Sequence, residues 1–262
     1  MRKIEKIPIS ADGLSIYLIP ALCNNVIAMI AINGSALVVD PGESHQVLEC
    51  LKQNDLALKS ILLTHAHRDH IGGVAQLKQE TRCLVYGCQE QDFDLIDIFL
   101  DDEQIVSFGP LRIMALNTPG HAKGHVVYFI LKENILFAGD LLFNVGCGKI
   151  FEGTVTEMID SLEKIKLLPD STRIFCGHEY TMNNLAFVES LGPNQKEIKE
   201  YSTLAKKRLQ KKSFAMPFDM KNQKKINPFL RVNEAGFGLK LGFSELKGAT
   251  LFAKLREMKD CF

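Results

Sequence analysis

Three histidines and one aspartate lie within six residues of one another, in the segment T-H-A-H-R-D-H at residues 64–70. The segment follows a short apolar run that is typical of a buried strand, so we expect the cluster in the loop at the strand's carboxyl end. Imidazole and carboxylate groups are ligands that suit zinc, iron and manganese. A tight loop can point His65 and His67 into one metal site while Asp69 and His70 reach a second. The alternative, a polar surface loop that is rich in histidine, is disfavoured by this spacing.

Three more side chains of the same kinds come directly after short apolar runs, each next to a glycine. They are His121, Asp140 and His178. A glycine at such a position lets the backbone pass close to an ion. Each is a weak signal alone, because an isolated aspartate is more often a helix cap or a turn residue. Four strand ends of this kind in one chain favour convergence on a single site. We expect a structural role for His125 and an exposed side chain for His45.

The elements that must hold these residues are short strands joined by turns. Apolar runs at 26–32 and 35–39 flank Asn33-Gly34, which is a strong hairpin signal. Two further pairs of runs, at 104–115 and 126–138, are divided by turns in the same way, and residues 155–167 have helical spacing. Since the strands come in hairpins and do not alternate strictly with helices, the pattern predicts mixed sheets covered by helices.

The composition changes near residue 180. Residues 1–180 carry 15 Lys and Arg against 23 Asp and Glu, whereas residues 181–262 carry 16 against 8. The second segment is also helically periodic and rich in lysine. We therefore predict a catalytic domain at 1–180 and a small helical substrate-binding domain at 181–262. A basic segment suits an anionic small molecule, an acidic surface or nucleic acid, but few aromatic residues accompany the lysines, which disfavours a nucleic-acid partner.

The overall composition, 46% hydrophobic and 24% charged, excludes a collagen-like, disordered or disulfide-scaffold chain. Seven cysteines without a C-x-x-C pair favour a reducing compartment. No uninterrupted apolar stretch reaches the ~18 residues of a transmembrane helix, and Glu5 and Asp12 interrupt the N-terminal apolar run. We expect a cytoplasmic monomer that binds a small-molecule substrate and has neither a membrane nor a nucleic acid as partner.

The metal-site cluster, followed by Gly-His at 120–121, Gly-Asp at 139–140 and Gly-His at 177–178, resembles the metallo-β-lactamase superfamily. Further segments resemble glyoxalase II, the hydroxyacylglutathione hydrolase family. They are T-P-G-H-A-K-G-H at 118–125, G-C-G-K-I-F-E-G-T at 146–154, C-G-H-E-Y-T at 176–181, N-P-F-L-R at 227–231 and R-E-M-K-D at 256–260. The resemblance runs from about Pro20 to the last residues. It implies an α/β fold of the α+β type, an αββα sandwich of two mixed sheets with a small helical C-terminal domain.

The resemblance also implies two metal ions per chain, zinc in preference to iron or manganese, held by two sets of three residues and one shared residue. The first set is His65, His67 and His121, the second set is Asp69, His70 and His178, and the bridging residue is Asp140.

The implied activity is the hydrolysis of S-D-lactoylglutathione, or a related glutathione thioester, to glutathione and D-lactate by a hydroxide that bridges the two ions. Asp69 is the expected catalytic residue, because its carboxylate can hold the proton of the hydroxide. Glutathione would be bound by Lys149, Tyr180, Arg256 and Lys259. At Phe151 the family often has tyrosine, so one hydroxyl contact to glutathione would be missing here.

Other activities on the same fold remain as alternatives. A persulfide dioxygenase would use one iron and would not need His178 as a ligand, so the number of bound ions separates it from a hydrolase with two ions. A lactonase, β-lactamase or nuclease is the other alternative. A non-catalytic member of the fold is disfavoured because all seven expected ligands are present.

Overall fold

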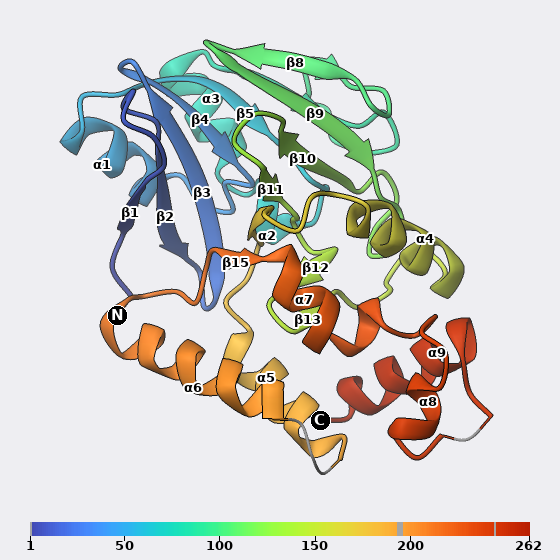
Figure 1. Cartoon of the computed structure of the whole chain (residues 1–262). Coiled ribbons are helices and arrows are strands. Elements are labelled where there is room, and N and C mark those ends of the chain that lie inside the picture. The colour runs from blue at the N-terminus through green and yellow to red at the C-terminus, as the bar shows by residue number, and fades with distance from the viewer. Residues whose placement is uncertain (1, 193–195, 244) are drawn as a thin grey trace.

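Two sheets stacked face to face form the centre of the molecule (Figure 1). The computed structural model describes residues 2–192, 196–243 and 245–262. The first sheet has seven strands. In spatial order these are β1 (Glu5–Pro8), β2 (Ser15–Ala21), β3 (Asn25–Ile32), β4 (Ser35–Val39), β5 (Ala57–Leu62), β6 (Leu84–Gly87) and β7 (Ile98–Phe99).

This first sheet is mixed. Strands β1 to β4 pair antiparallel and β4 to β7 pair parallel. The predicted hairpin at Asn33-Gly34 joins β3 to β4, and both turn residues have positive φ, as a tight hairpin turn requires. Parallel strands need a crossover, and here α1 (His45–Gln53) connects β4 to β5, while α2 (Arg68–Ile71) and α3 (Val74–Thr81) connect β5 to β6.

The second sheet has six strands and is also mixed, because β11 and β14 run parallel while the other neighbours run antiparallel. Its spatial order is β15 (Phe218–Asp219), β14 (Arg173–Phe175), β11 (Ile135–Phe137), β10 (Val126–Ile130), β9 (Leu111–Asn117) and β8 (Ile105–Phe108). The two hairpins predicted at 104–115 and 126–138 are the pairs β8–β9 and β10–β11. A separate small sheet contains β12 (Leu142–Phe143) and β13 (Gly146–Cys147).

The alternation of side chains along β3 shows how the layers are held together. Val26, Ala28 and Ile30 face the core between the sheets, and Ile27 and Met29 face a second core under α1 and α3. A strand that is apolar on both faces is typical of a sheet covered on both sides. Helix α4 (Val155–Lys166) belongs to the larger core and begins at a capping box of Thr154 and Glu157. The predicted αββα sandwich is therefore confirmed.

After residue 180 the chain is mainly helical, as the sequence predicts. Its helices are α5 (Thr181–Ser190), α6 (Lys196–Lys211), α7 (Met220–Ile226), the 3-10 helix η1 (Pro228–Leu230), α8 (Phe237–Lys240) and α9 (Gly248–Asp260). The segment also supplies β15, which pairs with β14 at the edge of the second sheet. The sequence does not predict β15, because a strand of two residues leaves no periodic signal.

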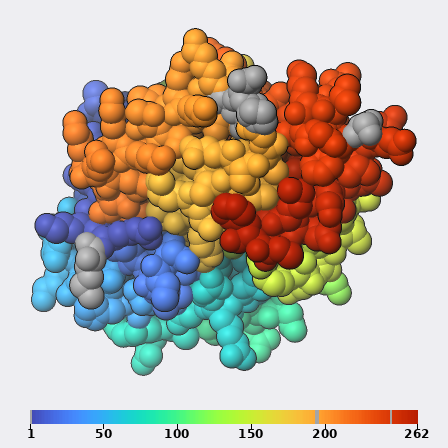
Figure 2. Space-filling model, turned by 90° about the horizontal axis from the view of Figure 1, so that it is seen from below, coloured from blue at the N-terminus to red at the C-terminus, as the bar shows by residue number. Residues whose placement is uncertain are grey.

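Seen from below, the C-terminal segment (orange to red) covers the upper part of this face, and earlier residues (blue to cyan) form much of its lower part (Figure 2). Helix α9 packs against α4, and η1 contacts α4, α9 and β13. The predicted division into two domains at residue 180 stays a prediction. Among the residues that the structure describes, no helix combines the length and apolar character needed to cross a membrane.

Candidate active site

The seven predicted metal-binding residues lie at one end of the sandwich, where strands of both sheets end. His65 follows β5, His67 caps α2, Asp69 and His70 lie within α2, His121 follows β9, Asp140 follows β11, and His178 follows β14. The short loops after these strands bring residues that are far apart in the sequence into one cluster. The structure thus places together every residue that the sequence singled out for metal binding.

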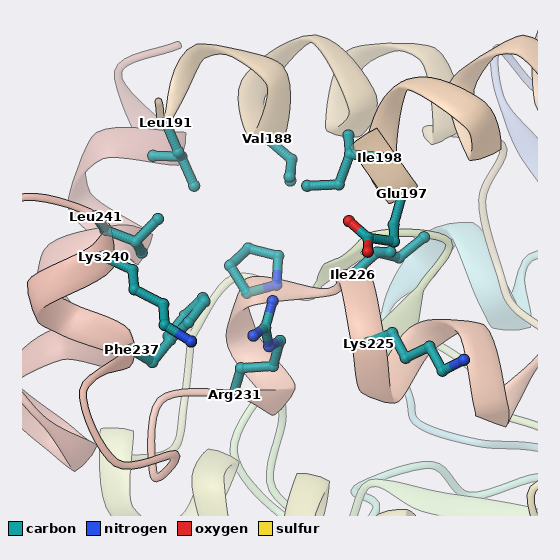
Figure 3. A pocket seen from close by; sticks show the side chains of 11 residues that line it. Val188, Leu191, Glu197, Ile198, Lys225, Ile226, Arg231, Phe237, Lys240 and Leu241 are labelled. Atoms are coloured by element: carbon teal, nitrogen blue, oxygen red, sulfur yellow. The ribbon is translucent and has the colours of Figure 1, made fainter. Parts of the chain in front are cut away.

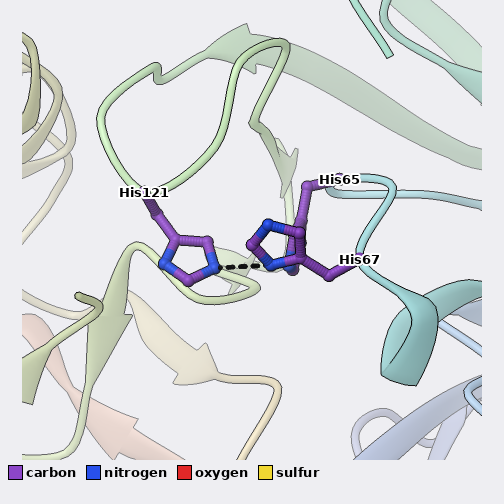
Figure 4. A group of neighbouring side chains, drawn as sticks. All are labelled: His65, His67 and His121. Carbon is purple, nitrogen blue, oxygen red and sulfur yellow. Dashed lines mark hydrogen bonds between the residues drawn. The ribbon is translucent and has the colours of Figure 1, made fainter. Parts of the chain in front are cut away.

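The first group contains His65, His67 and His121, whose rings converge from two loops (Figure 4). The Nδ1 atom of His67 lies 3.1 Å from the Nε2 atom of His121. The Nε2 atom of His65 is buried and has no hydrogen-bond partner among the described residues. A buried imidazole nitrogen without a partner is costly unless something binds it.

The second group contains Asp69, His70 and His178. The Nε2 atoms of His70 and His178 face each other at 3.3 Å, and Nε2 of His178 lies 3.4 Å from Oδ2 of Asp69. Two ring nitrogens directed at one another, with a carboxylate beside them, form a donor set of the kind that holds a cation.

Asp140 lies between the two groups. One of its oxygens, Oδ2, is 3.2 Å from Nε2 of His178 and 3.7 Å from Nε2 of His121. Its other oxygen, Oδ1, is buried without a hydrogen-bond partner among the described residues. The single carboxylate can therefore reach an ion in either group.

The protonation states suit metal binding. Burial, followed by the charge of His70, holds the pKa of His65 well below its usual value, so the ring is neutral. Burial opposes ionisation of Asp140, but His70 and His178 outweigh it and lower the pKa of the carboxyl well below its usual range. Burial likewise opposes charge on His70, yet Asp140 and Asp40 raise its pKa. The ionised carboxylates therefore stabilise positive charge at this position, and a metal cation can supply that charge.

Sequence reasoning missed the residue that orients His70. Asp40 follows β4 and is buried, and Oδ2 accepts hydrogen bonds from Nδ1 of His70 at 3.1 Å and from the hydroxyl of Thr64 at 2.6 Å. Its Oδ1 accepts from the backbone N–H of Thr64 at 2.7 Å. A carboxylate on the far nitrogen fixes the ring of a metal-binding histidine. Asp40 carried the same signal as Asp140, an aspartate after a short apolar strand with a glycine nearby.

Two asparagines, Asn24 in the turn after β2 and Asn25 at the start of β3, were also missed. Nδ1 of His178 donates to Oδ1 of Asn24 at 2.8 Å, and Nδ2 of Asn25 donates to Oδ2 of Asp69 at 3.0 Å. The hydrogen bond from His178, then that from Asn25, lowers the pKa of Asp69 far below its ordinary value although burial opposes this. The asparagines therefore hold two residues of the second group from outside it. Nothing in the sequence distinguishes them from ordinary turn residues.

His125 and His45 lie outside both groups, as expected. The buried ring of His125 accepts a hydrogen bond from the backbone N–H of Asp140 at 3.2 Å and bonds the hydroxyl of Thr118 at 2.9 Å. It thus supports the loop that presents Asp140. His45 is exposed at the start of α1.

A cavity of about 380 Å³ opens beside the metal-binding residues and is lined by all four predicted substrate-binding residues. Its wall includes His121, Asp140, Phe143, Cys147, Gly148, Lys149, Phe151, Tyr180, Asn183, Asn184, Arg256 and Lys259. A second, more open space of about 520 Å³ shares His121, Asp140, Phe151 and Tyr180 with it and extends over His67, Asp69, Glu152 and His178. A molecule bound in the first cavity can therefore present one end to the metal-binding residues.

The two lysines are suited to hold an anion in this cavity. The ammonium group of Lys149 is exposed and lies 3.6 Å from Oδ1 of Asp260. Lys259 contacts the side-chain oxygen of Asn183, and burial, then the nearby positive charge of Arg256, lowers its pKa to about 8.

Arg256 and Tyr180 are more constrained. Arg256 is only 8% exposed; it donates to the carbonyl of Cys147 at 3.0 Å and twice to Oδ1 of Asp260. Nη1 also contacts Sγ of Cys147 at 3.8 Å, so four of its five N–H groups have a partner and one is left for a ligand. The ring of Tyr180 stacks on His178 at 4.8 Å, and burial raises the pKa of its hydroxyl to about 12, so the hydroxyl stays a donor.

Comparison with known proteins agrees with this geometry. The family model of the metallo-beta-lactamase superfamily matches residues 21–178, and the structure is similar to a B3 metallo-beta-lactamase, BLEG-1 (TM-score 0.59, 24% identity, covering 87% of this chain and 99% of that one). It is also similar to ETHE1 from Myxococcus xanthus (TM-score 0.60, 21% identity, covering 99% of each chain). The fold is that of the metallo-β-lactamase superfamily.

The residues after 178 and the curated relatives identify the family within this superfamily. The family model of the hydroxyacylglutathione hydrolase C-terminus matches residues 179–262. The hydroxyacylglutathione hydrolase of Aliivibrio fischeri is 39% identical over 255 residues, which cover 95% of this chain and 100% of that protein. That of Klebsiella pneumoniae is 37% identical over 254 residues, with the same coverage. The chain belongs to the hydroxyacylglutathione hydrolase family.

Proposed function

We propose that this protein is a hydroxyacylglutathione hydrolase that converts S-D-lactoylglutathione, or a related glutathione thioester, to glutathione and the free hydroxy acid. The observation that carries the proposal is the cavity in which Lys149, Tyr180, Arg256 and Lys259 lie, because it shares His121 and Asp140 with the metal-binding cluster. A thioester held there by its glutathione part presents its carbonyl to that cluster.

We assign two metal ions to the cluster, one to each group of three residues, with Asp140 shared. Zinc is the metal we assign, since it favours imidazole and carboxylate ligands, and iron and manganese accept the same set. When bound, such ions lower the pKa of a water to about 7 and polarise a carbonyl oxygen. The unpartnered atoms Nε2 of His65 and Oδ1 of Asp140 support the assignment, because both are buried and able to donate a lone pair.

The chain's own residues position the reactants. Asp69 stays ionised at neutral pH, is 42% exposed, and faces the open space over the cluster. Its carboxylate can accept a hydrogen bond from the attacking water and so direct the oxygen lone pair toward the carbonyl carbon. The departing thiolate needs no general acid, since the pKa of its parent thiol is about 8.5. Thioester hydrolysis by this route therefore needs no serine or cysteine nucleophile.

The cavity wall determines which thioesters bind. Glutathione carries two carboxylates, which suit the ammonium groups of Lys149 and Lys259 and the remaining N–H group of Arg256. The hydroxyl of Tyr180 offers one further donor. Phe151 is 65% exposed at the rim and packs edge-on against His121, with no hydroxyl to give.

We further propose that the protein works as a monomer in the cytoplasm, without nucleic-acid or membrane partners. Every residue assigned to the metal cluster and to the cavity comes from one chain, which supports a complete site in a monomer. All seven cysteines are free, which fits a reducing compartment.

The test is a thioesterase assay on protein whose metal content has been measured. We expect thiol release from S-D-lactoylglutathione with two ions per chain, and far slower release from a small thioester that lacks the glutathione part. Oxygen consumption with glutathione persulfide, in protein that holds one iron, would instead establish the dioxygenase alternative and refute the proposal.

A further inference from the structure

A third cavity, of about 400 Å³, lies among the C-terminal helices and shares no lining residue with the two cavities at the metal cluster (Figure 3). Helices α5, α6, α7, η1 and α8 contribute its walls. The volume falls in the range of cavities that enclose small ligands, roughly 300–1,000 Å³. Nothing in the proposed hydrolysis uses this space.

The inner surface of this cavity is apolar. Val188 and Ile198 form one side, and Ile226, Pro228 and Phe237 form the other. Each of these residues is buried, so the surface is set deep between the helices and is not an exposed patch. An apolar chain placed here would leave water without unpairing any polar group.

Charged side chains surround the apolar surface. Figure 3 shows the guanidinium group of Arg231 and the ammonium group of Lys240 directed toward the middle of the cavity, with the carboxylate of Glu197 facing them from α6, while Lys225 points away. Arg231 is held in place, because its Nε donates to Glu234 at 2.9 Å and its guanidinium lies 4.3 Å from the centre of the Phe237 ring. Its terminal N–H groups remain directed at the cavity.

This arrangement selects the charge of the ligand. Arg231 is already paired with Glu234, so among the other described residues that line the cavity Lys225 and Lys240 are balanced by Glu197 alone, which leaves a single positive charge. The facing Glu197 would repel a doubly charged head such as a phosphate. A primary amine would be repelled by both cations. From the apolar walls and this charge balance we propose that the cavity binds a monocarboxylate with an unbranched apolar chain, such as a medium-chain fatty acid, with its carboxylate between Arg231 and Lys240.

The first test compares three probes of equal chain length by titration calorimetry on the full chain: octanoate, 1-octanol and octylamine. We expect octanoate to bind at one site, at least about tenfold more tightly than the other two, since a charge-assisted hydrogen bond contributes about a factor of 10 or more. Decanoate should bind about fourfold more tightly per added methylene. Equal binding of octanol, tighter binding of octylamine or no saturable binding would overturn the proposal.

Three Lys→Glu variants test whether octanoate binds in the cavity among the C-terminal helices. Lys240 is exposed, so its replacement should not disturb the core, and Lys240→Glu should weaken octanoate binding by about tenfold or more. Lys221→Glu makes the same change on α7 outside the cavity, and Lys149→Glu makes it in the catalytic cavity; both should leave octanoate binding unchanged. If either control loses as much affinity as Lys240→Glu, the ligand is held by general charge or by the catalytic cavity, and the proposal is wrong.

A variant that binds octanoate more tightly than the parent would exclude misfolding as the cause of the change. Among the described residues that line this cavity Glu197 alone carries a carboxylate, so Glu197→Gln should bind octanoate severalfold more tightly, which a misfolded variant cannot do. Unchanged or weaker binding by Glu197→Gln would contradict the assignment of the carboxylate to this cavity.

Discussion

Asp40→Asn tests how the second metal group is oriented, because it replaces a single oxygen by an NH₂ group at almost constant volume. In the parent, Oδ1 accepts from the backbone N–H of Thr64, and Oδ2 accepts from the Thr64 hydroxyl and from Nδ1 of His70. The backbone donor cannot change its role, so the amide oxygen must stay on it. The NH₂ group then faces Thr64 and His70. The hydroxyl can rotate and accept, whereas Nδ1 of His70 can accept only if its proton moves to Nε2.

That shift would disable the atom that faces the metal position. Nε2 of His70 lies 3.3 Å from Nε2 of His178 and 3.6 Å from Oδ1 of Asp140, and a protonated Nε2 has no lone pair for a cation. Loss of an outer partner of a metal-binding histidine costs about 10- to 100-fold in metal affinity. If the proton does not move, two donors face each other in a buried position, at a cost of about 1–3 kcal/mol in the free energy of unfolding.

The measurement is metal content after dialysis against increasing chelator, by elemental analysis. Asp40→Asn should fall toward one ion per chain at chelator concentrations where the parent holds two, and thioester hydrolysis should fall with it. Asp97→Asn is the matched control, because Asp97 also accepts from a backbone N–H, that of Val85, and from one side chain, that of Lys78, far from the cluster. Retention of two ions by Asp40→Asn refutes the tautomer argument, and equal metal loss in both variants would mean general destabilisation.

Three further predictions concern the bridge, the cavity and its rim. Asp140→Ala should lose affinity for both ions and most turnover, since its carboxylate reaches both groups; near-parental metal content would contradict its shared role. The pKa of Lys259, about 8, means that the ammonium is charged below this pH and neutral above it, so kcat/KM for the glutathione thioester should fall as pH rises through about 8. Lys259→Arg should abolish that decline, and an unchanged pH profile would exclude Lys259 as its source. Phe151→Tyr should lower KM about 2- to 10-fold for the glutathione thioester alone, by one added hydrogen bond; an equal effect on a small thioester would point to a different cause.

The clustering of the seven candidate metal-binding residues could be predicted because their signals are local. Each follows a short apolar strand, and the ends of strands in stacked sheets meet at one edge, so position along the chain already implies proximity. Asp40 shows the limit of this reasoning. It carries the same signal as Asp140 and lies beside His65 and His70, but its carboxylate accepts from the backbone N–H of Thr64 and from the far nitrogen of His70, so it is placed to orient His70.

Other features depend on contacts between distant segments. Asn24 and Asn25 act on the second group because the turn after β2 crosses to the loop after β14, where Asn25 forms an isolated bridge with His178. A turn asparagine has the same local pattern whether or not such a contact exists. The strands β12, β13 and β15 were missed for a related reason, since two residues of extended chain contain no period.

Arg256 and Lys259 illustrate how tertiary burial separates residues that the sequence makes equivalent. Both are cations on one face of α9, three positions apart, and both line the catalytic cavity. Arg256 is buried and donates to the carbonyl of Cys147 and to the exposed carboxylate of Asp260, so its removal would leave the buried carbonyl of Cys147 without this donor, at a cost of about 1–3 kcal/mol in the free energy of unfolding. A rise in KM for an Arg256→Ala variant would therefore mix damage to the wall with loss of substrate contact. Among the described residues Lys259 hydrogen-bonds to the exposed Asn183 and lies near the rings of Phe187 and Phe262, so Lys259→Ala leaves no buried carbonyl without its donor. A change in KM for Lys259→Ala is therefore a more direct test of the proposed contact with glutathione.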